Sequence, residues 1–148
     1  LSLRDDRRYE LVGGKLVEKP VSALSSLVAG IVYELLAEFV RREGLGIVFP
    51  PDLTYQCFPN DPSLVRRPDV SFVKEGRFQG DTLPQGHVRI APDLVVEVIS
   101  PGTEAIDRGE KFYEYEQGGV REYWLVDPEH VGDRVGASRS TYASYWFG

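Results

Sequence analysis

The stretch that decides the fold is residues 92–101, which read PDLVVEVISP. Its centre is an almost continuous run of branched apolar residues, the pattern of a β-strand that is covered on both faces of a sheet. The exception in this run is Glu97. A carboxylate inside a buried strand costs several kcal/mol unless it is paired, hydrogen-bonded or bound to a metal. The sequence therefore predicts a buried strand over 94–99 and a partner for Glu97.

Asp69 is the obvious partner, because it directly follows Pro68 at the start of another predicted strand over 69–73. Two apposed carboxylates repel each other and so hold a hard divalent cation, with water completing its shell. The pair therefore indicates a Mg²⁺ or Mn²⁺ site. The residues alone leave an alternative open, in which Glu97 faces solvent at a sheet edge and Asp69 only caps a turn.

Two local patterns precede this pair in the chain. Residues 9–18 read YELVGGKLVE, and the Gly-Gly at their centre predicts a tight β-hairpin. Over 24–40 the apolar residues recur in alternating steps of three and one, which predicts one face of a long helix. Ser22 is placed to cap the start of this helix, and Gly44 is placed to end it.

The remaining segments complete a single domain over 1–148. One strand, interrupted by Pro50-Pro51, is predicted over 47–49 and 53–58, a further strand over 122–126, and a helix over 103–117. The order after the hairpin is αβββαβ, which indicates an α/β (α+β) fold with a mixed central sheet flanked by helices. The core extends over 22–128, and the tail over 129–148 has no assignable pattern.

Composition excludes several classes of protein. The chain has 148 residues with 17 Lys and Arg against 23 Asp and Glu, so its net charge is −6 and any contact with nucleic acid must be local. One Cys and two His exclude an internal disulfide and a zinc site of Cys/His type. No secretory signal and no apolar run of ~18 residues is apparent. We expect a soluble cytoplasmic protein without a membrane partner.

Several motifs in order carry a resemblance to a known family. Pro68-Asp69, followed by Glu97 in an apolar strand, resembles the PD-(D/E)xK nuclease superfamily with its restriction-endonuclease-like fold. The closer similarity, from Tyr9 to Pro128, is to the bacterial "putative restriction endonuclease" family. It rests on PDLVVEVISP at 92–101, on Asp107, Lys111 and Tyr115, and on EYWLVDP at 122–128.

This resemblance implies metal-dependent hydrolysis of a DNA phosphodiester. Asp69 and Glu97 would be metal ligands, with the backbone carbonyl of Val98 as a third. A lysine would position or deprotonate the attacking water and stabilise the developing charge. The superfamily places that lysine where this chain has Ile99, and the closer family places it on the next helix, at Lys111. The resemblance therefore makes Asp69, Glu97 and Lys111 the catalytic residues.

The helical pattern by itself gives Lys111 a different position. At ~100° per residue, Lys111 lies nearly opposite the apolar stripe of its helix and shares a face with Asp107 and Tyr115. That position favours a solvated ion pair between Asp107 and Lys111, worth only ~0.3 kcal/mol.

Other charged residues have weaker patterns. Glu10 and Glu18 could add an outer carboxylate to the metal site, but alternation on an exposed hairpin explains them as well. Arg66 and Arg67 could contact a phosphate, although surface charge is the preferred interpretation. Cys57 is expected to be a buried small hydrophobe.

Three functions fit these residues. The first is a divalent-metal DNA endonuclease, which we expect to act as a homodimer that doubles its DNA-binding surface. The second is a catalytically inactive DNA- or partner-binding module that retains the nuclease fold, favoured by Ile99 and by the net charge of −6. The third is a metal-dependent hydrolase of another phosphate ester. The retained Asp69, Glu97 and Lys111 favour the first.

The carboxylate pair also predicts a stability effect. If Asp69 and Glu97 face each other without a cation, their repulsion strains the metal-free protein, and Glu97→Gln should relieve that strain. If Glu97 pairs instead with a cation such as Arg66 or Lys111, the same substitution should destabilise the protein.

Overall fold

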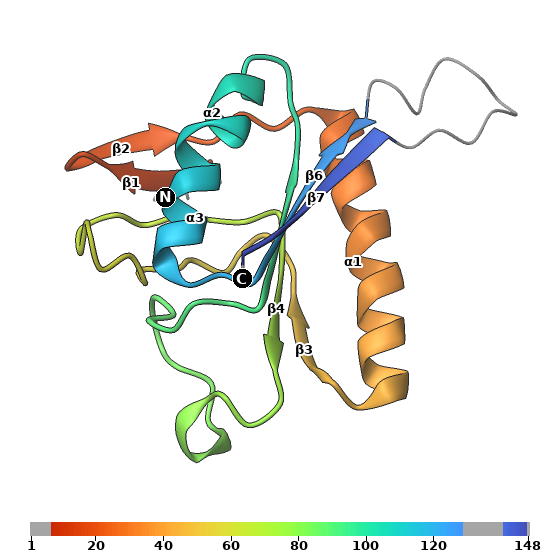
Figure 1. The fold of residues 1–148 in the computed structure, drawn as a ribbon. Coiled ribbons are helices and arrows are strands. Elements are labelled where there is room, and N and C mark those ends of the chain that lie inside the picture. The colour runs from red at the N-terminus through yellow and green to blue at the C-terminus, as the bar shows by residue number, and fades with distance from the viewer. Residues whose placement is uncertain (1–6, 129–140, 148) are drawn as a thin grey trace, which may run out of the picture.

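A five-stranded mixed sheet forms the centre of the protein, in a computed structural model that describes residues 7–128 and 141–147 (Figure 1). In spatial order its strands are β3 (Gly46–Phe49), β4 (Val70–Lys74), β5 (Leu94–Val98), β6 (Glu122–Asp127) and β7 (Thr141–Trp146). β5 and β6 run parallel, whereas the other neighbouring strands pair antiparallel. The apolar run around Glu97 therefore forms the central strand, as its sequence predicts.

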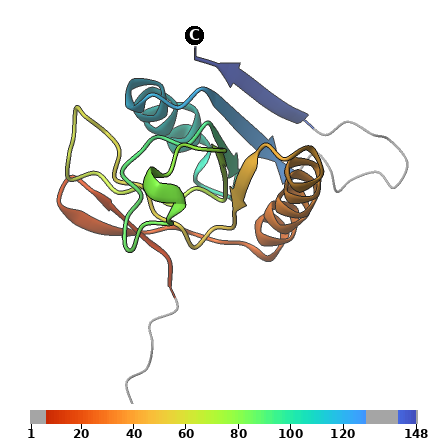
Figure 2. The ribbon, with the colours of Figure 1, turned by 90° about the horizontal axis from the view of Figure 1, so that it is seen from below.

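One face of the sheet is covered by α1 (Ala23–Glu43) (Figures 1 and 2). Its ends are those that the sequence predicts. The Ser22 side chain accepts a hydrogen bond from the Ser25 N–H, and Gly44 ends the helix with φ 64°, a left-handed conformation that glycine adopts without strain. Apolar side chains of α1, β3, β4 and β5 form the core on this side: Val40, Val48, Val70, Leu94 and Val96.

The outer side of α1 carries an apolar stripe that the described residues leave exposed. We call Leu24, Leu27, Ile31, Leu35 and Phe39 the outer stripe. With it, α1 is long and apolar enough to span a membrane by length and composition, at a mean hydropathy of 1.7, which the sequence analysis did not anticipate. The inner side of the same helix packs on the sheet, as in the core helix of a globular domain.

The opposite face of the sheet is covered by the N-terminal hairpin and two short helices. The hairpin consists of β1 (Tyr9–Val12) and β2 (Lys15–Glu18), and the helices are α2 (Glu104–Arg108) and α3 (Glu110–Gly118) (Figure 1). A second core lies here, formed by Tyr55, Cys57, Phe58, Leu64, Val88, Val95, Tyr115, Val120, Tyr123 and Leu125. Cys57 is therefore buried, as expected. A short 3₁₀ turn, η1 (Gln79–Asp81), lies in the long connection between β4 and β5.

The observed elements differ from the prediction in three places. The helix predicted over 103–117 is divided at Gly109, whose φ of −104° and ψ of −89° are not helical. A Cβ there would lie 2.9 Å from the Ala105 carbonyl oxygen. The strand predicted over 53–58 is wrong, because after Pro50-Pro51 this segment makes only isolated bridges through Tyr55.

The third difference is β7, which the sequence analysis left unassigned. Residues 141–146 pair antiparallel with β6 and add a strand at the edge of the sheet. The rest of the predicted tail, residues 129–140 and 148, lies outside the described residues. The order after the hairpin is therefore αβββααββ, and the α+β class with a mixed, helix-flanked sheet is confirmed.

Candidate active site

The pairing of β4 with β5 brings the two predicted carboxylates together. Val70 is opposite Val96 in this antiparallel pair, so continuing the register by one residue places Asp69 beside Glu97. Because side chains alternate along a strand, both carboxylates face away from α1. Glu97 is 1% exposed and Asp69 is 8% exposed. The alternative with Glu97 at a solvent-facing sheet edge is therefore wrong.

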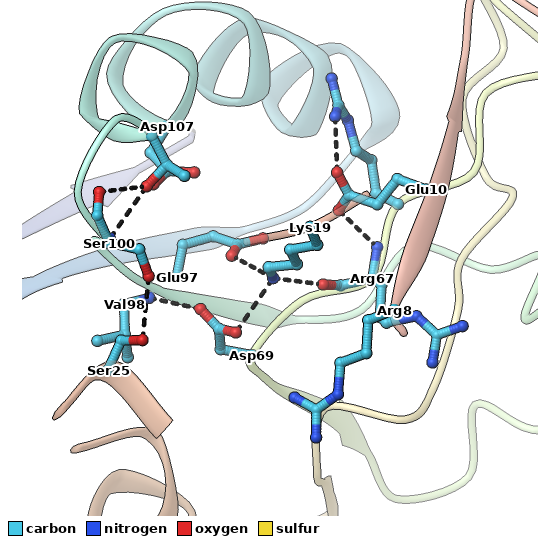
Figure 3. Close-up of polar contacts among 12 residues, drawn as sticks. Arg8, Glu10, Lys19, Ser25, Arg67, Asp69, Glu97, Val98, Ser100 and Asp107 are labelled. Carbon is cyan, nitrogen blue, oxygen red and sulfur yellow. Dashed lines mark hydrogen bonds and ion pairs between the residues drawn. The ribbon is translucent and has the colours of Figure 1, made fainter. Parts of the chain in front are cut away.

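A lysine that the sequence analysis missed lies between the two carboxylates (Figure 3). The Lys19 Nζ is 2.9 Å from Glu97 Oε2 and 3.1 Å from Asp69 Oδ1, and it donates a hydrogen bond of 2.6 Å to the Arg67 carbonyl oxygen. Lys19 directly follows β2, so the hairpin delivers this ammonium to the sheet. No pattern in the sequence indicates the contact, because Lys19 and Glu97 are 78 positions apart.

A second lysine reaches Glu97 from α3. The Lys111 Nζ is 3.5 Å from Glu97 Oε1 and 3.1 Å from Asp107 Oδ1. The latter contact is an ion pair without an aligned hydrogen bond, since Asp107 Oδ1 accepts none from the described residues. The Tyr115 hydroxyl donates to Glu97 Oε1 at 3.2 Å. The three residues of the predicted helical motif thus all face the carboxylate pair.

The solvated position favoured for Lys111 by the helical pattern is wrong. Lys111 is 4% exposed and Asp107 is 2% exposed. The break at Gly109 changes the direction of the chain between Asp107 and Lys111, so the phase of one continuous helix does not apply. Ile99, in the usual place of the lysine, is buried, and its N–H donates to the Val126 carbonyl. Lys111 therefore brings an ammonium to Glu97 from α3, whereas the strand has Ile99.

A buried arginine network supports the same region from the hairpin side. The Arg66 guanidinium donates to Glu10 Oε2 at 2.9 Å and forms a two-point contact with Glu114, at 2.7 and 2.9 Å. Glu10 Oε1 accepts from the Arg67 N–H and lies 3.8 Å from the Lys111 Nζ. The interpretations of Arg66 as surface charge and of Glu10 as an exposed hairpin residue are both wrong, whereas Glu18 is exposed.

The pKa values of the two carboxylates are shifted in opposite directions. For Glu97, burial favours the protonated form, but Lys111 and Lys19 outweigh it and lower the pKa to about 2. For Asp69, burial is the largest influence and Glu97 adds repulsion, so the pKa is raised to about 6 despite the Lys19 ammonium. The pKa of Lys111 is raised above its ordinary value because Glu97 outweighs burial, so this amine stays charged at neutral pH.

These groups line one cavity of about 300 Å³. The described part of the chain holds no cluster of three or more His, Cys, Asp and Glu that could bind a metal. Two carboxylate oxygens and one carbonyl oxygen nevertheless converge on a cation, the Lys19 ammonium. Oxygen ligands of this kind suit a hard divalent ion, so the residues fit Mg²⁺ or Mn²⁺ in place of the ammonium.

Val98 lies beside this convergence point. Its backbone N–H donates a hydrogen bond of 2.7 Å to Asp69 Oδ2, which leaves the other oxygen of that carboxylate directed at the Lys19 Nζ (Figure 3). Val98 thus orients one of the two carboxylates. The role of its carbonyl as a third metal ligand stays a prediction.

A mixed sheet, a carboxylate pair at the junction of two adjacent strands and a lysine on the following helix together define the restriction-endonuclease-like class. Residues 1–134 match the sequence model of the Uma2 family, described as "putative restriction endonuclease", and the chain belongs to this family. The predicted family is therefore confirmed. A search of curated proteins finds no match.

A solved structure has the same fold. It is a protein from Anabaena variabilis ATCC 29413 described as "a putative nuclease belonging to DUF820", with a TM-score of 0.69 and 21% sequence identity. The similarity covers 82% of the present chain and 66% of the other chain, so the present chain spans slightly less than two thirds of its length.

Proposed function

We propose that the protein is a divalent-metal-dependent DNA endonuclease. The observation that carries this proposal is the convergence of Asp69, Glu97 and Lys111 at the end of the central strands. Glu97 is 1% exposed and keeps its charge, with a pKa of about 2. A buried charged carboxylate beside a second carboxylate and an ammonium is costly as pure structure, and it matches the needs of a phosphodiester hydrolase.

Each residue of the site has a role in the proposed reaction. When bound, a divalent ion polarises the scissile phosphate and lowers the pKa of a coordinated water. Asp69 and Glu97 would hold that ion. Lys111, which stays charged at neutral pH, is suited to stabilise the negative charge that develops on the phosphate rather than to deprotonate water. Tyr115 fixes the orientation of Glu97 through its hydroxyl.

A specific observation supports the second candidate function, an inactive DNA- or partner-binding module. The Lys19 ammonium lies where a metal ion would contact both carboxylates. An internal cation of this kind can replace a metal structurally and so keep the fold intact without catalysis. The arrangement of Lys111 and Asp107, however, adds a second buried ammonium that a purely structural replacement would not need.

DNA is the proposed substrate, and a homodimer is the proposed form. The net charge of −6 requires local contacts, and Arg8 and Lys19 line the cavity. The outer stripe of α1 supports association of two copies, because exposed apolar patches mark interaction sites. Light scattering tests the dimer. A dimer should have twice the 16.6 kDa mass of one chain, and a measured mass of 16.6 kDa at high concentration would refute it.

Cleavage of plasmid DNA tests the nuclease directly. Purified protein is incubated with supercoiled DNA in Mg²⁺, in Mn²⁺ and in EDTA, beside Asp69→Asn prepared in the same way to exclude a contaminating nuclease. We expect nicking or linearisation by the wild type with metal and none in EDTA or with the variant. No cleavage of duplex, branched or single-stranded DNA in either metal would support the inactive module instead.

A further inference from the structure

Lys19 lies inside the site, and the proposed chemistry gives it no role. Its side chain is 9% exposed, and three oxygen atoms surround its Nζ: Asp69 Oδ1, Glu97 Oε2 and the Arg67 carbonyl oxygen. The ammonium donates hydrogen bonds to the Arg67 carbonyl oxygen and to Glu97 Oε2, and it forms an ion pair with Asp69 Oδ1. Lys19 is therefore held in this position by specific bonds and does not merely rest near it.

The ammonium and a divalent ion cannot share this position. A Mg²⁺ ion contacts carboxylate oxygens at about 2.1 Å, so an ion bridging Asp69 and Glu97 would occupy the space between their oxygens. The Lys19 Nζ fills that space at 2.9 and 3.1 Å from the same two oxygens. Steric overlap and like charge both require that one cation leaves when the other enters.

The balance of buried charge favours this exchange. Among the described residues, the buried charged side chains are four carboxylates and two cations: Glu10, Asp69, Glu97 and Asp107 against Arg66 and Lys111. Their formal charges leave an excess of two negative charges. The Lys19 ammonium neutralises half of this excess, whereas a divalent cation neutralises all of it.

The cavity has space for the Lys19 side chain after its displacement. Lys19 stands at the end of β2, in a hairpin outside the central sheet, and the cavity of about 300 Å³ extends from the carboxylates to Glu18 and Arg8. Rotation of the flexible Lys19 side chain into that space leaves the backbone in place. The exposed Glu18 beside it offers an alternative anionic partner.

We propose that Lys19 is a built-in competitor of the metal, which occupies the cation position between Asp69 and Glu97 until a divalent ion displaces it. This inference rests on the proposed function, because it takes the divalent ion from there. Its consequence is specific to this chain. The affinity for the metal is lowered by the need to expel the ammonium, and half of the excess negative charge of the metal-free site stays compensated.

The test is Mn²⁺ binding by calorimetry, without DNA, to the wild type, Lys19→Met and Lys19→Gln. Lys15→Met is the matched control, since Lys15 is an exposed lysine of β2, the strand that Lys19 directly follows. The glutamine variant keeps a hydrogen-bond donor without charge, which protects against loss of folding. We expect both Lys19 variants to bind Mn²⁺ about tenfold more tightly or better, and the control to bind like the wild type.

Thermal melts provide an independent readout. In EDTA, Lys19→Met should melt below the wild type, because two carboxylates lose their cation, and saturating Mn²⁺ should raise its melting temperature more than that of the wild type. Tight binding by the variants with none by the wild type also supports the competitor. Equal affinity in all four proteins overturns this inference and leaves a metal-dependent nuclease intact. No Mn²⁺ binding by any of them overturns the metal site itself.

Discussion

Replacement of Glu97 by Gln distinguishes a strained carboxylate pair from a site filled by cations. Gln has the same shape as Glu, so the substitution removes a charge without creating a cavity. In the structure Glu97 contacts the Lys19 Nζ at 2.9 Å and the Lys111 Nζ at 3.5 Å. The condition of two carboxylates without a cation is therefore not met in the metal-free protein, because Lys19 lies between them. We predict that Glu97→Gln is destabilised in EDTA.

The size of this destabilisation depends on the ion pairs that Lys19 and Lys111 retain in the variant. Breaking a buried ion pair by removal of one partner costs about 3 to 5 kcal/mol. Lys19 retains Asp69 at 3.1 Å, and Lys111 retains Asp107 at 3.1 Å, so the lower value applies. A loss of about 3 kcal/mol lowers the melting temperature of a chain of this size by about 10 °C.

The assay is a pair of thermal melts at pH 7, one in EDTA and one in saturating Mg²⁺. At this pH the contribution of Glu97 is complete, because a pKa lowered to about 2 gives stability that is lost only on acidification below the ordinary carboxylate range. The variant should also lose the stabilisation by Mg²⁺, about 2.7 kcal/mol at 100 times the dissociation constant. A variant that melts at or above the wild type in EDTA would refute the reasoning.

Three further predictions concern stability. Because the folded state raises the Asp69 pKa from 3.8 to about 6, the folded protein binds this proton more tightly, and the metal-free protein should lose about 3 kcal/mol between pH 4 and 6. Urea unfolding across this range should show that loss in the wild type, with Asp69→Asn lacking it; equal pH profiles would contradict it. Gly30→Ala in α1 meets no atom within 4 Å and should stabilise the protein by about 1 kcal/mol. Gly46→Ala should instead destabilise it severely, since its Cβ would overlap the Val73 carbonyl oxygen; a Gly46→Ala melt like that of the wild type would disprove this.

The parts of the fold that the sequence predicts are those set by local chemistry. The hairpin follows from Gly13-Gly14, and the ends of α1 follow from Ser22 and Gly44. The central strand follows from its apolar run, and the one charged residue in that run, Glu97, marks the site. Asp69 follows because a buried carboxylate needs a partner on a neighbouring strand. Apart from the pairing of Asp69 with Glu97, these signals lie within a few residues of the feature they predict.

The parts that the sequence does not predict depend on contacts between distant segments. Lys19 meets Glu97 across 78 positions, and Arg66 meets Glu114 across 48 positions. The residues around Lys19 and Arg66 in the sequence do not show whether each side chain is buried against a carboxylate or exposed to solvent. The predicted solvent-exposed position of Lys111 is wrong for another reason. The break at Gly109 interrupts the continuous helical phase from which that position was inferred.

The rate of DNA cleavage at saturating Mn²⁺ by the wild type and Lys111→Met is the most direct measurement of the proposed function. Lys74→Met is the control, since Lys74 is exposed at the end of β4 opposite to Asp69. The proposed mechanism predicts equal cleavage by the wild type and the control, and a loss of about 100-fold or more in Lys111→Met with unchanged Mn²⁺ binding. Cleavage by Lys111→Met at the wild-type rate, or a wild type no more active than its EDTA blank, would contradict the account.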